Sequence, residues 1–199
     1  MNSTVSADSS RVAVLIDRLA RITREIQFVE GLNPAQWEAL RFVARANRYS
    51  RTPSALAEFL GATKGTASQT LIALEQKGYV RRVRSEVDRR QIDLTLTDSG
   101  RELLAKDPIR GVEQAADQIP GETSSTLVDG LTQLLDGLRS RHAIKEFGVC
   151  RQCNMLRTDE KHMQQCGVTG EPLSNGDVDH ICINYESAGV AHAALSGAR

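Results

Sequence analysis

One stretch of two short predicted helices followed by a hairpin constrains the fold of this chain more than any other part of the sequence. The first helix is predicted in "TPSALAEFLG" (residues 52–61), where Thr52 is a suitable N-cap and Pro53 takes the first helical position. The second is predicted over residues 64–78, "KGTASQTLIALEQKG", with Gly78 suited to the C-terminal cap. Two short helices joined by a tight turn that contains glycine form the helix-turn-helix pattern, in which the second helix enters the major groove of DNA.

The exposed side of the second helix carries polar groups that suit contact with DNA. These groups fall in its first half, where helix-turn-helix proteins place their base contacts, and they donate or accept hydrogen bonds. The predicted DNA-binding residues there are Lys64, Thr66, Ser68 and Gln69. Pairs of short helices with a polar face also occur in folds that never bind DNA, so this helix pair alone does not decide the function.

The segment after the second helix predicts a two-stranded hairpin. Two runs rich in β-branched residues, "YVRRV" (79–83) and "IDLTLT" (92–97), are joined by the charged stretch "RSEVDRRQ". A hairpin directly after a recognition helix is a wing, and its arginines can reach phosphates or the narrow minor groove. The predicted wing contacts are Arg84, Arg89 and Arg90, and Asp88 is placed to hold the tip through an ion pair. The alternative is that these arginines only solvate a loop tip.

The order of these elements resembles the MarR family of bacterial winged helix-turn-helix regulators. The resemblance covers about residues 10–142 and is carried by Gly78 after the recognition helix, by the Asp-x-Arg motif from Asp88 to Arg90, and by "LTLTDSG" before the next helix. It implies a mainly α fold with a small β-wing and a helical dimerisation region. It also implies a homodimer that binds a pseudo-palindromic DNA operator, usually as a repressor, with an affinity that a small ligand or oxidation lowers.

Two further amphipathic helices are predicted outside the winged segment, over residues 11–29 and 122–144. The second of them carries a leucine stripe at helical spacing, made of Leu127, Leu131, Leu134, Leu135 and Leu138. Neither helix has an obvious partner within a compact winged domain. We therefore expect both to pack against a second copy of the chain, which would set the two recognition helices about 34–36 Å apart. The alternative is that the leucine stripe is intramolecular core.

The four cysteines of the chain are gathered in its C-terminal part. Cys150 and Cys153 form a C-x2-C pair, and Cys166 and Cys182 follow. A C-x2-C pair places two sulfurs within reach of one tetrahedral metal, and two further thiolates complete a four-cysteine set. Residues 147–186 are therefore predicted to form a metal-binding module, whereas the alternative is that the cysteines are scattered small core residues.

Two metal centres are compatible with this pattern. The irregular spacing of the four thiolates favours an iron-sulfur cluster, since structural zinc sites usually show a second close pair. Zn2+ is the alternative, and His162 or His180 could substitute for a thiolate, although both are more typical of a polar surface. The segment has few large apolar residues, so a bound metal would supply folding free energy that a core cannot.

The position of the module allows two roles. It begins directly after the last predicted dimer helix, so a change in its metal or oxidation state would alter the recognition-helix spacing and the affinity for DNA. Alternatively, a zinc module is structural or docks another protein, and a small-molecule inducer binds in the cleft between the dimer helices and the winged domain. Residues 1–9 are expected to be disordered, and residues 187–199 to form a flexible tail.

Other function classes have little support in the sequence. The C-x2-C spacing also occurs in thiol-disulfide oxidoreductases, but those place it at a helix start in a βαβ unit, so we do not expect an enzyme. The N-terminus lacks the basic and apolar regions of a signal peptide, and no apolar run reaches the roughly 20 residues that cross a bilayer, so a cytoplasmic protein is expected.

Charge is distributed unevenly along the chain. Basic and acidic residues number 25 each, yet residues 77–101 carry seven Lys or Arg against four Asp or Glu. Such a local basic strip suits a phosphate backbone, whereas the alternative is a solvated charged face.

Overall fold

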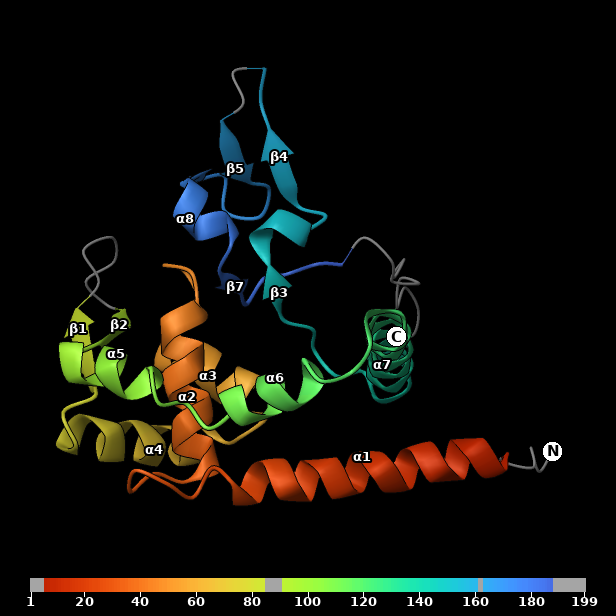
Figure 1. Ribbon diagram of the computed structural model, residues 1–199. Helices are drawn as coiled ribbons and strands as arrows, with labels where there is room; N and C mark the ends of the chain where they lie inside the picture. Colours follow the sequence, from red (N-terminus) through yellow and green to blue (C-terminus); the bar gives the residue numbers. More distant parts are fainter. Residues whose placement is uncertain (1–5, 85–90, 161–162, 188–199) are drawn as a thin grey trace, which may run out of the picture.

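The computed structural model describes residues 6–84, 91–160 and 163–187 (Figure 1). As predicted, the fold is dominated by helices and contains a small β-wing. In chain order the first part consists of α1 (Ala7–Glu25), α2 (Pro34–Arg45), α3 (Pro53–Phe59), α4 (Lys64–Gln76), β1 (Val80–Arg84), β2 (Ile92–Leu96), α5 (Asp98–Leu104), α6 (Arg110–Ala116) and α7 (Gly121–His142). The C-terminal module consists of β3 (Gly148–Val149), a 3-10 turn (Cys150–Gln152), β4 (Leu156–Thr158), β5 (Gln164–Cys166), β6 (Pro172–Leu173), α8 (Asn175–Val178) and β7 (Ile181–Cys182).

Side-chain caps fix the starts of the helices in the winged part. Thr52, Thr63 and Thr97 each accept the backbone N–H three residues further on, at 3.2, 3.1 and 3.0 Å. Asn33 and Gln36 cap α2 reciprocally, each side chain accepting the other residue's backbone N–H. Local sequence therefore sets where α2, α3, α4 and α5 begin, and the helix-turn-helix is the pair α3 and α4.

A single apolar core holds the winged part together. Helix α2 lies at its centre and contacts α3, α4, α5 and β2. The largest fully buried apolar side chains of this core are Trp37, Leu40, Phe42, Leu56, Leu71, Leu74, Val80 and Leu94. Antiparallel pairing of β1 with β2, from Val80 opposite Leu96 to Arg84 opposite Ile92, confirms the predicted hairpin.

The N-terminal helix differs from its prediction at both ends. Helix α1 begins at Ala7, inside the segment predicted to be disordered, because the Ser6 side chain caps it by accepting the N–H of Ser9. It ends at Glu25, and the chain then turns through Glu30 and Gly31, both at positive φ. Residues 1–5 and 188–199, where disorder and a flexible tail were predicted, lie outside the described residues.

Helix α6 was not predicted. Its assigned first residue follows Ile109, whose side chain supplies no capping hydrogen bond, and the start signal lies earlier, in the pair Asp107 and Pro108. The buried carboxylate of Asp107 accepts the N–H of Ile109 at 3.0 Å, as an N-cap does, and the guanidinium of Arg41 at 2.8 Å. A tertiary contact therefore orients the link between α5 and α6.

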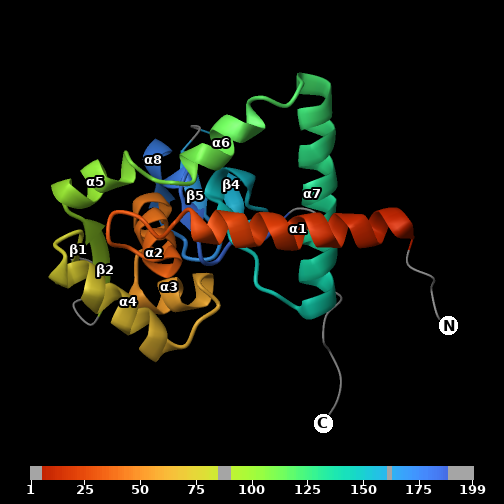
Figure 2. The same ribbon diagram turned by 60° about the horizontal axis from the view of Figure 1, so that its bottom comes forward.

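Helices α1 and α7 extend away from the winged core and cross each other (Figure 2). Neither helix has a buried residue. Among the described helices, none combines the length and apolar character that crossing a membrane requires. The two longest helices of the described chain are thus amphipathic elements that pack little of their surface within it.

The C-terminal module sits on the winged part next to the end of α2 (Figure 1). It contains an antiparallel sheet of β4, β5 and β6 and a separate antiparallel pair of β3 and β7. Ile181 of β7 forms a parallel bridge with Ala46 and belongs to the core of the winged part. The module and the winged part therefore share buried surface.

Substituting Gly100 is expected to destabilise the fold. An added Cβ would lie 2.2 Å from the carbonyl oxygen of Tyr79, so α5 would have to move away from the wing. We expect Gly100→Ala to lower the free energy of unfolding by about 2 kcal/mol, measured by urea denaturation.

Gly111→Ala is the matched control, since nothing lies within 4 Å of a Cβ added there in α6. It should be neutral or stabilising by up to about 1 kcal/mol. Equal effects of the two substitutions would contradict the close approach of α5 to Tyr79.

Candidate nucleic-acid interface and cysteine cluster

Helix α4 presents a polar side to solvent while Ala67, Leu71 and Leu74 are buried on the other side. Thr66 and Gln69 are exposed on this polar side and Ser68 is half-buried, whereas Lys64 is exposed at the first position of the helix. Thr66 shares a hydrogen bond of 2.9 Å with the capping hydroxyl of Thr63, so part of its role is to start the helix. Within the described residues no hydrogen bond or ion pair engages the side chains of Lys64 and Gln69, which leaves both available to an external partner.

The wing is tied to α4 by a residue that sequence reasoning missed. The Arg82 guanidinium lies 3.0 Å from the Glu75 carboxylate and also donates to the Ser68 carbonyl at 3.4 Å. The backbone N–H of Arg82 donates to the same carboxylate at 3.2 Å. The only hint of this pair in the sequence is that Glu75 and Arg82 carry opposite charges and lie seven positions apart, on either side of the turn at Gly78.

The wing tip itself is only partly described. Arg84 is exposed at the end of β1, where it can reach a phosphate backbone. Asp88, Arg89 and Arg90 lie outside the described residues. The ion pair predicted for Asp88 and the two contacts predicted beyond it stay predictions.

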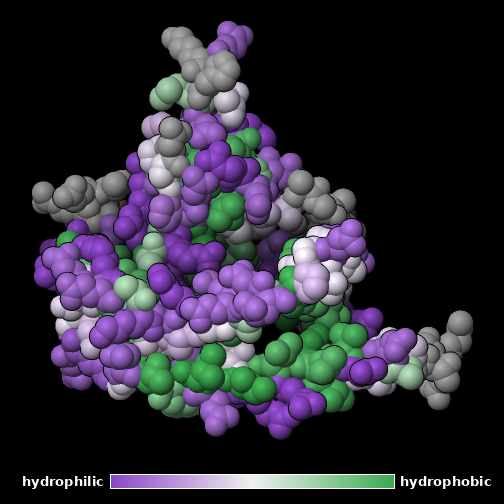
Figure 3. Space-filling model, in the orientation of Figure 1, coloured by the Kyte–Doolittle hydropathy of each residue, from purple (hydrophilic) through white to green (hydrophobic). Residues whose placement is uncertain are grey.

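Apolar side chains line α1 and α7 without being covered by the described residues. Their exposed fractions lie between 41% and 59% for Val12, Leu15, Leu19, Ile22, Leu127, Leu131, Leu135 and Leu138. Figure 3 shows the apolar surface as a band that follows α1 and continues towards α7. Four of the five leucines of the stripe are therefore exposed and Leu134 is half-buried, so the stripe is not core within the described residues.

A cavity of about 540 Å3 lies beside these helices, lined by residues of α1, α2 and α7 among others. Its wall is mainly apolar, with Leu19, Phe59 and Leu131, and it also contains Arg41. The Arg41 guanidinium donates to Gln27 at 2.6 Å and to Asp107 at 2.8 Å, which fixes one charged group at the edge of an apolar space.

Two of the four cysteines meet directly in the C-terminal module. Cys150 and Cys182 are both buried, and their thiols hydrogen bond to each other. Cys166 packs against the same apolar cluster, which also contains Leu173 and Val178.

The predicted four-cysteine set is only partly assembled. Cys153 ends the 3-10 turn, and its Sγ accepts the N–H of Glu186 at 3.5 Å. Within the described ranges, no three His, Cys, Asp or Glu side chains lie close enough to hold one ion. Of the two possible substitute ligands, His162 lies outside the described residues, and the Nδ1 of His180 is engaged with the Gly176 carbonyl.

The contact between Cys150 and Cys182 makes the two thiols unequal. The hydrogen bond with Cys150 lowers the pKa of Cys182 to about 6, although burial acts in the opposite direction. Donors from the Asn184 backbone and from the Asn47 and Ser50 side chains also lower this pKa. The same contact, followed by burial, raises the pKa of Cys150. The pair therefore favours a thiolate at Cys182 beside a thiol at Cys150, and a thiolate is the form that ligates metals.

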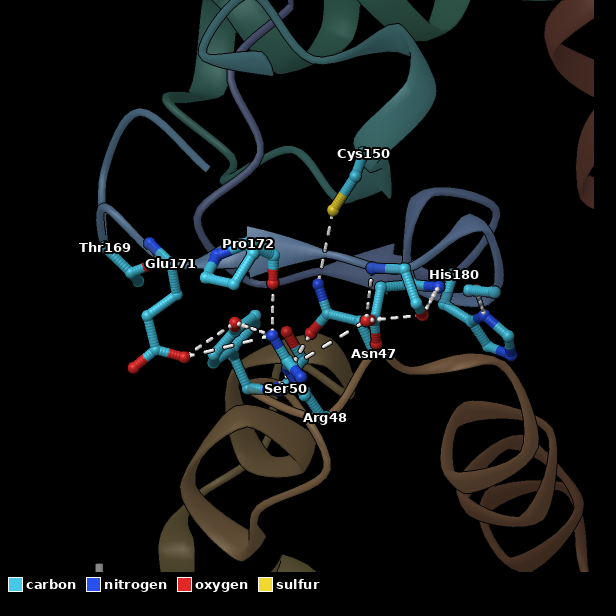
Figure 4. Close-up of polar contacts among 12 residues, drawn as sticks. Asn47, Arg48, Ser50, Cys150, Thr169, Glu171, Pro172 and His180 are labelled. Atoms are coloured by element: carbon cyan, nitrogen blue, oxygen red, sulfur yellow. Dashed lines mark hydrogen bonds and ion pairs between the residues drawn. The ribbon is translucent and has the colours of Figure 1, made fainter. Parts of the chain in front are cut away.

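Residues 46–52, here called the α2–α3 corner, hold the cysteine cluster against the helix-turn-helix (Figure 4). Asn47 donates its backbone N–H to the Ile181 carbonyl at 2.9 Å and its side-chain amide to the Cys150 sulfur at 3.3 Å. The Ser50 hydroxyl accepts the N–H of Ile183 at 2.9 Å. Sequence reasoning missed these polar residues, because their partners lie more than a hundred positions further along the chain.

The outer side of the corner adds charged contacts to the module. The Tyr49 hydroxyl donates to the Glu171 carboxylate at 2.8 Å, and the Arg48 guanidinium contacts the Pro172 carbonyl. Arg48 also lies over the Tyr49 ring, 4.8 Å from its centroid. The corner is therefore held on both its buried and its exposed sides.

The pair α3 and α4, followed directly by a two-stranded wing, defines a winged helix-turn-helix protein. Residues 30–91 match the model of the MarR family. The fold is also that of a solved MarR family transcriptional regulator, Sco3205 of Streptomyces coelicolor in complex with DNA, with a TM-score of 0.57 and 24% identity over 70% of this chain and 92% of that chain. Streptococcus pneumoniae FabT in complex with DNA is similar as well, with a TM-score of 0.51 and 27% identity over 67% of this chain and 95% of that chain.

Two curated regulators are similar in sequence. The transcriptional repressor MprA of Escherichia coli strain K12 is 30% identical over 112 residues, which cover 56% of this chain and 63% of MprA. The HTH-type transcriptional regulator PecS of Dickeya dadantii is 32% identical over 110 residues, which cover 54% of this chain and 64% of PecS. The chain thus spans less than two thirds of the length of these relatives.

The Arg82–Glu75 pair is expected to couple the wing to α4. Both side chains are about 30% exposed, so we expect Arg82→Met and Glu75→Gln to show a coupling energy of about 1 kcal/mol in a double-mutant cycle. Urea unfolding of the four proteins measures this energy. The exposed pair Arg101 and Asp98 is the control and should couple weakly, whereas strictly additive effects at Arg82 and Glu75 would rule out the tie.

Proposed function

We propose that the protein is a DNA-binding transcriptional regulator that inserts α4 into the major groove and places its wing against the neighbouring backbone. The observation that carries this proposal is the exposure of Lys64 and Gln69 in the first half of a helix that buries Ala67, Leu71 and Leu74 in the winged part. A glutamine in this position suits bidentate contact with adenine, and a lysine suits guanine or a phosphate.

The wing supports the same proposal through its charge. Arg81, Arg82 and Arg84 are exposed on β1, and Arg82 is anchored to α4. Because the anchored hairpin moves with α4, Arg84 keeps a fixed position relative to the recognition helix and to the DNA groove that this helix would enter. Two of the similar structures, those of FabT and Sco3205, are complexes with DNA, which supports DNA as the partner.

We further propose that the chain acts as a homodimer on a two-fold operator. The exposed apolar faces of α1 and α7 would be covered by the same faces of a second copy, since large uncovered apolar patches usually mark interfaces. A two-fold axis through these helices would pair the recognition helices with two half-sites about one DNA turn, roughly 34 Å, apart.

Repression released by a small molecule is the regulatory mode that we propose. MprA, a relative in sequence, is a transcriptional repressor. The cavity of about 540 Å3 beside α1, α2 and α7 falls in the size range of small-molecule sites and adjoins the proposed dimer helices. Its apolar wall and the fixed Arg41 suit an apolar molecule that carries an acidic group.

DNA binding is tested by alanine substitutions on α4 and the wing. An operator is first selected from a random-sequence library, and affinities are then measured by fluorescence anisotropy at several salt concentrations. Gln69→Ala and Lys64→Ala are each expected to weaken operator binding by about 1–3 kcal/mol, with Gln69→Ala relaxing the preference at one base pair. Arg84→Ala should weaken binding to all sequences and lower the salt slope by about one.

Arg157→Ala is the control for these substitutions, because it removes an exposed arginine from the C-terminal module instead of the winged part. It should leave operator affinity unchanged. Selection of no sequence, or equal affinities for all four variants and the wild type, would contradict the proposed function.

Dimerisation is tested on α7. Leu135→Glu places a charge in the exposed apolar face and should convert the dimer into monomers, since an unpaired charge is costly in an apolar interface. Gln133→Glu adds the same charge on the opposite, exposed side of the helix and should leave the dimer intact. Sedimentation equilibrium measures both, and a wild-type monomer at micromolar concentration would contradict this interface.

A further inference from the structure

The cysteine cluster is the part of the molecule that a DNA-binding function does not explain. We propose that Cys150, Cys153, Cys166 and Cys182 bind one thiophilic divalent ion of the zinc class, and that this ion fixes the α2–α3 corner of the helix-turn-helix. The site lies away from the groove-facing side of α4, so the proposal does not depend on the protein binding DNA.

The strand register places Cys150 and Cys182 on the same side of the β3–β7 pair, where one ion can bridge their sulfurs. Cys182 pairs with Gly148, while the N–H of Cys150 donates to the His180 carbonyl at 3.4 Å. The two cysteines are thus diagonal neighbours at the end of the β3–β7 pair. Their thiols hydrogen bond to each other there, and two ligands of one tetrahedral ion with bonds of about 2.3 Å are neighbours in the same way.

The same contact separates a single ion from a four-iron cluster. A four-iron cluster binds each cysteine to a different iron, which keeps the ligating sulfurs apart. Here two sulfurs touch, and Cys166 packs beside them in a cluster completed by Leu173 and Val178. A single metal ion is the smallest centre that these three cysteines could ligate together.

Hydrogen-bond donors converge on the sulfurs. The Asn47 amide donates to Cys150 at 3.3 Å, and the Glu186 backbone donates to Cys153 at 3.5 Å. A protonated thiol is a weak acceptor, whereas metal-bound thiolates commonly have such donors around them. The donors come from the winged part and from the end of the module, so both parts surround the cluster.

The module has little else to stabilise it. Its own cluster of buried residues consists of Cys150, Leu173, Val178 and Cys182, so half of its members are cysteines. Its strands are two or three residues long. Small folds of this kind usually require a metal or a disulfide, and a metal supplies its binding free energy directly to folding.

Ion binding requires two side chains to turn. No three potential ligands are gathered in the described residues, so Cys153 and Cys166 must rotate towards the Cys150–Cys182 pair. Both are only partly buried, which gives their side chains room. Cys153 lies one turn of the 3-10 segment from Cys150, a spacing typical of two ligands of one ion.

Binding of the ion would act on the helix-turn-helix through the corner. Asn47 touches both Cys150 and β7, and Ser50 receives the N–H of Ile183 directly beyond Cys182. The corner leads into Thr52, the cap of α3. Fixing the sulfurs therefore fixes the start of the first helix of the helix-turn-helix.

The first experiment measures metal content and affinity. The full chain is stripped with a chelator under reducing conditions and titrated with Zn2+, and metal is quantified by mass spectrometry alongside the protein as purified. We expect one zinc per chain and protection of all four cysteines from iodoacetamide. Cys153→Ser and Cys166→Ser should each weaken zinc binding at least tenfold, whereas Met163→Ser, an exposed control in the same module, should not.

The second experiment measures the coupling. Trp37 is the only tryptophan and is fully buried in the winged core, so its fluorescence reports unfolding of that part alone. We expect Zn2+ to raise the midpoint of thermal unfolding by several degrees in the wild type. Asn47→Ala should still bind one zinc per chain but lose most of this shift.

Each outcome bears on the proposal. Absence of zinc binding, purification with iron and acid-labile sulfide, or a Cys150–Cys182 disulfide in place of the ion would overturn the site. Zinc binding that leaves Trp37 unfolding unchanged would overturn the link to the corner. A protein that binds zinc but no DNA would refute the proposed function and leave this inference standing.

Discussion

Burial of one face of α2 is the constraint on which the rest of the structure depends. Six of its twelve residues are buried, and α3, α4, α5 and β2 all contact it. At roughly 25 cal/mol per Å2 of apolar surface, contacts of this kind dominate the stability of a small domain. The recognition helix and the cysteine module are thus both positioned relative to α2, and neither can shift without disturbing the packing of its buried residues Trp37 and Phe42.

Local signals in the sequence were enough to predict most of the winged part. Threonine caps, glycine stops and β-branched runs depend on neighbours within a few positions, and α3, α4 and the hairpin of β1 and β2 follow them. The predicted helix boundaries were wrong, or a helix was missed, where local signals were weak or where a contact distant in sequence also acted on the same residues. Ser6 capped α1 earlier than the apolar pattern suggested. The start of α6 was missed because Asp107, which accepts the N–H of Ile109 there, also forms a buried ion pair with Arg41 that the local sequence does not reveal.

The candidate sites show the same division between local and distant contacts. The polar face of α4 was predictable because a helix that buries Ala67, Leu71 and Leu74 on one side must expose Thr66 and Gln69 on the other. The corner contacts were not, because nothing in "ANRYS" indicates that Asn47 would meet a cysteine 103 positions away. The contact between Arg82 and Glu75 is an intermediate case. The two residues are near in sequence, but their proximity in space can be inferred only once the turn at Gly78 is known.

The position of Ile181 in the core of the winged part also has a consequence for synthesis on the ribosome. The core residues of α2 to α5 have all been translated once the ribosome passes Leu104. This core is completed only later, by Phe147, Ile181 and Ile183. At roughly 5–20 residues per second, several seconds pass between Leu104 and Ile181. During that interval the nascent helix-turn-helix lacks part of its packing, so a functional recognition helix and a finished C-terminal module are made together.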